Sequence, residues 1–201
     1  MNRMAIGRMG VWLTMVAMWL AGCSSNNCSL ENLVTCNYGF YDSEGTAVTY
    51  GDVITIRTLL PGMKTVYTYR KWGEKTVVLD ERDSVLLADG YTESVDEVRR
   101  DTVIANRLTG ASGMKLPMSY YRDCDTLVFS YETLSNCDTL YLHHESFPHV
   151  DLPECGVQRF HRLTGVRGTN SAAMSGVAIA DERVDDEGRE NIKIYFNGVA
   201  Q

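Results

Sequence analysis

The sequence has no cluster of basic residues, and this lack excludes one large class of function. Its 201 residues hold 19 Lys and Arg against 26 Asp and Glu, which gives a formal net charge of −7. Proteins that bind nucleic acids use groups of Lys and Arg to neutralise the phosphates. We therefore expect no nucleic-acid partner.

The motifs of several common active sites are also missing. The sequence contains no Gly-x-Ser-x-Gly turn, no Cys-x-x-Cys pair, no His-Glu-x-x-His and no glycine pattern that cradles phosphates. The Gly-Ala-Ser-Gly segment at 110–113 lacks the flanking strand and helix of a nucleophile turn. We therefore predict a protein that is not an enzyme and that needs no cofactor.

A long apolar run is absent as well. The most apolar stretch, residues 11–20, is about ten residues long, whereas a membrane-spanning helix needs roughly 20. Arg3 and Arg8 precede this stretch, and no acidic residue occurs before Cys23. Because this layout is typical of a secretory signal peptide, we expect residues 1–22 to be removed. The loss of two arginines takes the formal charge from −7 to −9.

The segment Leu20-Ala21-Gly22-Cys23 resembles the lipobox of bacterial lipoproteins. In that family the cysteine thiol receives a diacylglycerol, the chain is cut before the cysteine, and the new amino group is acylated. The resemblance implies that Cys23 is the lipidation site and that acyl chains hold the protein to a membrane. Ser24 in place of an aspartate favours the outer membrane. The lack of an acidic run after Cys23 favours its periplasmic face, with surface exposure left open. The alternative is a plain secreted protein.

The rest of the chain has the pattern of strands. Only four prolines occur, and from residue 38 on short β-branched and aromatic runs alternate with turn residues. We expect an all-β fold, an antiparallel β-sandwich of immunoglobulin-like or related type. A linker would cover residues 23–37 and a single domain residues 38–201. Within the domain, Pro61-Gly62 separates two expected strands. The segment 93–110 is ambiguous between helix and strand. Strands near 176–181 and 191–197 are expected to end the domain.

Two copies of Cys-Asp-Thr-Leu, beginning at Cys124 and Cys137, indicate two successive strands. If the chain turns near Thr133-Leu134, Cys124 faces His143 and Cys137 faces Ser130, so the two cysteines lie too far apart for a disulfide. Export permits disulfides elsewhere. We predict a bridge from the N-terminal pair, Cys28 and Cys36, to Cys155. At least one thiol stays free, because five cysteines remain after Cys23.

Metal ligands are weakly indicated by His143, Glu145 and His149. Neighbouring residues of a strand point to opposite faces, so His143 and Glu145 share a face and His149 adds a third ligand type. No signature spacing supports a metal site at these residues, and we predict no bound metal.

The acidic segment 181–190 lacks the calcium-loop spacing and indicates a hairpin turn. Tyrosines such as Tyr120 and Tyr121 suit either a sugar- or peptide-binding surface or, as we favour, packing pairs.

Four short motifs resemble a domain family of short lipoproteins from Bacteroidales and relatives, over about residues 28–197. They are Leu116-Pro117, Asp138-Thr139-Leu140, Cys155-Gly156 and Asn191-Ile192. That family has no established activity, so the resemblance implies a compartment and a fold but no catalytic residue.

These observations predict a lipid-anchored envelope lipoprotein that acts as a non-catalytic structural or binding module. Tethering would raise its effective concentration near an envelope protein or a glycan partner. One alternative is a periplasmic metal- or small-ligand-binding lipoprotein. Another is a fimbrillin-like subunit, which requires a basic processing site soon after Cys23. The first basic residue after Cys23 is Arg57, which disfavours it.

Overall fold

A computed structural model describes residues 34–150 and 157–197. The predicted cleavage site, Cys23, Cys28, Cys155 and Gly156 lie outside these residues. The strands are β1 (Thr35–Tyr41), β2 (Ile54–Arg70), β3 (Val77–Leu79), β4 (Thr92–Leu108), β5 (Gly113–Pro117), β6 (Cys124–Tyr131), β7 (Cys137–His149), β8 (Gln158–Gly168), β9 (Met174–Ile179), β10 (Arg183–Val184) and β11 (Ile192–Phe196). One short helix, α2 (Ser84–Ala88), interrupts them. Over the described residues, no helix has the length and apolar character needed to cross a membrane.

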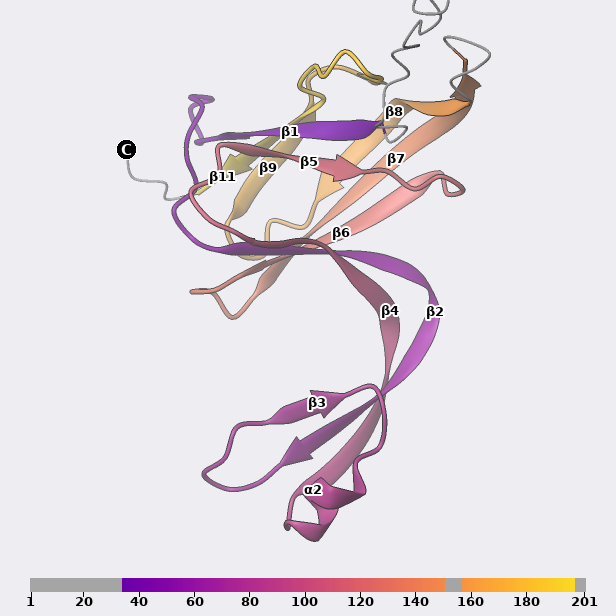
Figure 1. Cartoon of the computed structure of the whole chain (residues 1–201). Helices are drawn as coiled ribbons and strands as arrows, with labels where there is room; N and C mark the ends of the chain where they lie inside the picture. The colour runs from indigo at the N-terminus through magenta and orange to yellow at the C-terminus, as the bar shows by residue number, and fades with distance from the viewer. Residues whose placement is uncertain (1–33, 151–156, 198–201) are drawn as a thin grey trace, which may run out of the picture.

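The strands form two sheets packed face to face, and the predicted all-β sandwich is confirmed (Figure 1). One sheet has the order β5-β1-β11-β9, and the other has the order β10-β8-β7-β6-β2-β3 with β4 also paired to β2. The strand pairs of the described residues are antiparallel except one. Strands β1 and β11 run parallel, with Tyr38 opposite Ile192. This pair joins the two ends of the domain.

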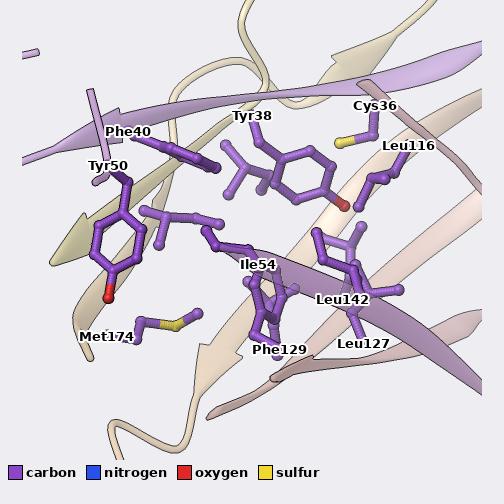
Figure 2. Packing of buried hydrophobic residues seen from close by; sticks show 14 of the residues in the cluster. Cys36, Tyr38, Phe40, Tyr50, Ile54, Leu116, Leu127, Phe129, Leu142 and Met174 are labelled. Carbon is purple, nitrogen blue, oxygen red and sulfur yellow. The ribbon is translucent and has the colours of Figure 1, made fainter. Parts of the chain in front are cut away.

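The core lies between the sheets and follows the alternation of each strand. Strand β1 contributes Cys36, Tyr38 and Phe40, and β2 contributes Ile54 and Ile56, all of them buried. Figure 2 shows Cys36, Tyr38, Phe40 and Ile54 in one cluster with Leu127 and Phe129 of β6 and Leu142 of β7. The ring of Phe196 in β11 lies edge-on to Phe40, with centroids 5.2 Å apart. Burial of each large apolar side chain contributes about 1.5–3 kcal/mol to folding.

Strand β1 begins at Thr35, inside the segment expected to be linker. Asn37 explains why this polar stretch is ordered, because its backbone N–H donates to Asn191 Oδ1 at 3.0 Å and its carbonyl accepts from the Asn191 N–H at 2.9 Å. The Asn191 amide group also donates to the Arg183 carbonyl at 2.7 Å. The Asn-Ile motif therefore holds the first strand against the last.

Strands β2 and β4 continue past the sandwich as a twisted arm that carries β3 and α2 (Figure 1). The sequence predicted a break at Pro61-Gly62, and this prediction is wrong. The pairing of β2 with β4 shifts register between Leu59 and Met63 and then continues to Arg70. A bulge can absorb extra residues without ending a strand, and Gly62 has a φ of 89°, which suits glycine. The ambiguous segment 93–110 is largely strand β4.

The hairpin formed by β6 and β7 has the predicted register. Cys124 lies opposite His143, and Ser130 lies opposite Cys137. The two Cys-Asp-Thr-Leu copies therefore start at opposite ends of one strand pair, which confirms that Cys124 and Cys137 are not partners.

Candidate functional site

A surface hollow of about 560 Å³ lies where the loop between β5 and β6 meets β7 and β8. Its size falls within the usual range of small-molecule sites, roughly 300–1,000 Å³. Its walls combine aromatic, cationic and anionic side chains, from Tyr120, Tyr121, Arg122, Asp123, His144, Glu145, Ser146 and Arg159. We treat it as the candidate site.

The loop that forms one wall is fixed by the buried carboxylate of Asp125. This group accepts the Ser119 backbone N–H at 2.8 Å and Nη2 of Arg122 at 2.9 Å. Arg122 in turn donates to the Leu59 carbonyl at 2.6 Å and to Ser119 Oγ at 2.9 Å. Hydrogen bonds between charged partners are stronger than neutral ones, so the loop is held in one conformation.

Two buried histidines lie beneath the hollow. His144 Nε2 is 3.2 Å from Asp125 Oδ2, and His144 Nδ1 is 3.2 Å from His161 Nδ1. These two contacts use both ring nitrogens of His144, one toward Asp125 and the other toward His161. Burial, helped by neighbouring His144, lowers the pKa of His161 to about 4. His161 is therefore uncharged near neutral pH, and the two buried rings form the floor beneath the hollow.

Sequence reasoning missed this histidine pair, because the contact between the two rings depends on a bulge. The register of β7 against β8 shifts between His143 and His144, and His144 turns into the interior with 1% of its surface exposed. His161 follows 17 residues later on the neighbouring strand. No local spacing encodes such a contact.

Tyr120 and Tyr121 form an exposed aromatic corner at the rim. Their rings meet edge to face with centroids 4.7 Å apart, and 91% of Tyr121 is exposed. The Arg159 guanidinium lies 4.3 Å from the centre of the Tyr120 ring and donates to Ser146 Oγ at 3.0 Å. These tyrosines lie in a loop and not in a strand, so the expected cross-strand packing does not describe them. Tyr41, by contrast, pairs with Tyr195 of the neighbouring strand.

The weak metal candidates do not form a ligand set. His143 Nε2 is 3.9 Å from Cys124 Sγ, Glu145 forms an ion pair with Arg162 at 3.0 Å, and the His149 ring stacks on Phe160. Within residues 34–150 and 157–197, no three His, Cys, Asp or Glu side chains are placed to hold a metal ion.

The acidic turn that raised the question of calcium surrounds an arginine. Arg189 forms ion pairs with Asp181 at 3.5 Å, with Glu187 at 3.2 Å and with Asp185. Its single positive charge offsets part of the negative charge of these three carboxylates, and the short strand β10 lies in the same segment.

Two of the three thiols of the described residues, those of Cys36 and Cys124, are shielded from water and are poor nucleophiles. Burial raises the pKa of Cys36 to about 12, with a hydrogen bond to Tyr38 opposing the rise. Burial also raises the pKa of Cys124. Cys36 is a buried free thiol among the described residues, and the predicted bridge to Cys155 stays a prediction. Its proposed partners lie outside the described residues.

Asp138 of the Asp-Thr-Leu motif holds the loop before β9. Its fully buried carboxylate accepts the Tyr131 hydroxyl at 2.9 Å. It also accepts four successive backbone N–H groups at 2.5–2.8 Å, those of Ser171, Ala172, Ala173 and Met174. Leu116 of the Leu-Pro motif is a core residue with 1% of its surface exposed. The described motif residues therefore support the fold.

Comparison with known families gives one match. The model of a "Family of unknown function (DUF6452)" matches residues 92–196, just over half of the chain. The chain belongs to this family. The DUF6452 match runs from the start of β4 to the end of β11 and includes every wall residue of the hollow. No curated protein and no solved structure shows a significant match to the chain.

Proposed function

We propose that this chain is a lipid-anchored lipoprotein of the cell envelope whose β-sandwich acts as a non-catalytic binding module. The observation that carries the proposal is Leu20-Ala21-Gly22-Cys23 directly after a short apolar run with a basic flank. The outer membrane, on its periplasmic face, is the proposed location. The motif resemblance to short lipoproteins of Bacteroidales belongs to the same proposal.

A binding role fits the state of the polar groups in the sandwich. Among the described residues the buried carboxylates are those of Asp125 and Asp138, and both are occupied by hydrogen bonds from loops. Activated nucleophiles need a lowered pKa or an adjacent base, whereas the pKa values of Cys36 and Cys124 are raised. The hollow offers a fixed polar and aromatic surface, which suits recognition of a ligand.

Membrane anchoring determines where the binding module meets its partners and how often. Two or more acyl chains hold a protein stably to a bilayer, whereas one chain holds it only marginally. A domain confined to a membrane meets envelope partners at a raised effective concentration, so even a weak site is well occupied.

The test replaces the proposed lipidated cysteine. In a Gram-negative host fed labelled palmitate, the wild-type chain and the control Cys28→Ser incorporate label and sediment with the outer membrane. Cys23→Ser incorporates none and keeps its signal peptide. A Cys23→Ser chain that matures normally and stays in the membrane fraction overturns the proposal.

A further inference from the structure

We propose that the hollow beside Tyr120 and Tyr121 binds a neutral saccharide. This inference deepens the binding role proposed above and rests on it. It follows from three properties of the wall: a rigid exposed aromatic pair, balanced charge, and polar groups left available for a ligand.

The aromatic pair is exposed although its loop is rigid. Tyr121 is 91% exposed and Tyr120 is 45% exposed, while Asp125 and Arg122 hold the loop between them. The guanidinium of Arg159 supports Tyr120. Tyrosine offers a large apolar face with a polar end at a small cost in side-chain entropy. A fixed tyrosine face of this kind matches the C–H face of a sugar ring.

The charge of the wall selects an uncharged ligand. Arg122 is neutralised by Asp125 at 2.9 Å and Glu145 by Arg162 at 3.0 Å, which leaves one cation, Arg159, and one anion, Asp123, on the wall. A site for an anionic ligand needs surplus cations, and a lipid site needs an apolar lining. This wall has neither property.

The remaining polar groups suit hydroxyl recognition. The Asp123 carboxylate makes no hydrogen bond or ion pair within the described part of the chain, so it can accept from two hydroxyls. Ser146 Oγ and the Arg159 guanidinium supply an acceptor and donors on the opposite wall. A molecule with many hydroxyls and one apolar face uses all of these groups at once. A hollow of about 560 Å³ accommodates a short oligosaccharide.

The experiment uses the full chain extracted in detergent and four soluble neutral trisaccharides, made of glucose, mannose, galactose or N-acetylglucosamine. Isothermal titration calorimetry measures the Kd of each, with a galacturonic acid trimer as the anionic comparison. We expect at least one neutral sugar to bind. Tyr121→Ala and Asp123→Asn then weaken that binding at least tenfold. Trp72→Ala, which removes a fully exposed aromatic ring from the arm, changes it less than twofold.

Three results overturn the inference. These are no binding of any neutral trisaccharide at millimolar concentration, tighter binding of the anionic trimer, or equal effects of Tyr121→Ala and Trp72→Ala. The melting temperatures of the variants check that each is folded. Palmitate labelling tests lipid anchoring independently of sugar binding. A labelled chain that binds no sugar therefore refutes this inference but not the proposed lipid anchor.

Discussion

Asp125 and Asp138 occupy the same place in two copies of Cys-Asp-Thr-Leu, and each turns its carboxylate inward to hold a loop. Asp125 holds the loop before β6 through Ser119 and Arg122. Asp138 holds the loop before β9 through the backbone from Ser171 to Met174. The repeat thus places one anchoring carboxylate near each end of the hairpin, and only the Asp125 copy adjoins the hollow.

Removal of the Asp138 carboxylate is expected to destabilise the fold strongly. Asp138→Ala leaves four backbone N–H groups and the Tyr131 hydroxyl without their acceptor. Each unsatisfied buried group costs about 1–3 kcal/mol, so we expect a loss of at least about 3 kcal/mol in urea unfolding. The control Asp96→Ala, on an exposed part of β4, is expected to change stability by less than about 0.5 kcal/mol. Equal stability of both variants contradicts this assignment.

The contribution of the Asp138 carboxylate to the free energy of unfolding is expected to depend on pH in the acid range. Burial alone would raise the pKa of Asp138, but hydrogen bonds from Met174, Ala172, Tyr131 and Ala173 outweigh burial and lower it. Its stabilisation is therefore complete above the unfolded pKa of about 3.9 and is lost as the pH falls through the lower, folded value. The stability difference between wild type and Asp138→Asn should shrink below pH 4. A constant difference down to pH 2 contradicts the lowered pKa.

Because of its lowered pKa, His161 is expected to make the stability of the fold depend on pH at higher pH values than Asp138 does. Its folded pKa of about 4 lies below the ordinary value of 6.5, so the unfolded chain binds a proton that the folded chain rejects. Stability falls as the pH drops below 6.5 and levels off near pH 4, by about 3 kcal/mol in all. His161→Gln should lack this component. NMR titration measures the pKa directly, and a value near 6.5 for His161 contradicts the prediction.

The register of the β6–β7 hairpin was predictable because it depends on neighbouring sequence. The two copies lie thirteen residues apart, and alternation along each strand fixes which residues face each other. The parallel contact of β1 with β11 was not predictable, since Tyr38 and Ile192 are distant in sequence. The hollow could not be predicted either, because its walls come from segments that are distant in sequence. It depends on the bulge at His143–His144 and on a loop conformation set by Asp125.

Gly113 is expected to tolerate no side chain. A Cβ at this position would overlap the backbone carbonyl oxygen of Tyr38, and the paired strand cannot move without loosening β1. Gly113→Ala should lower the free energy of unfolding by about 1–3 kcal/mol. Gly51→Ala is the matched control, because its Cβ meets nothing within 4 Å. It should be neutral or slightly stabilising. The opposite order of the two variants in thermal unfolding contradicts the close approach.

The described thiols are expected to differ in reactivity. In the native chain iodoacetamide should modify exposed Cys137 first, partly buried Cys124 more slowly, and Cys36 only after denaturation. The cause is burial, which raises the pKa of Cys36 to about 12 and blocks access to it. Peptide mass mapping measures the three rates. Alkylation of native Cys36 as fast as Cys137, or a disulfide at Cys36, contradicts the structure.

The measurement that tests the central claim most directly is the intact mass of the chain extracted from membranes, taken with and without reduction. The account predicts a polypeptide that begins at Cys23, heavier than residues 23–201 by a diacylglycerol and an amide-linked acyl chain. An unmodified polypeptide, or one that retains residues 1–22, contradicts it.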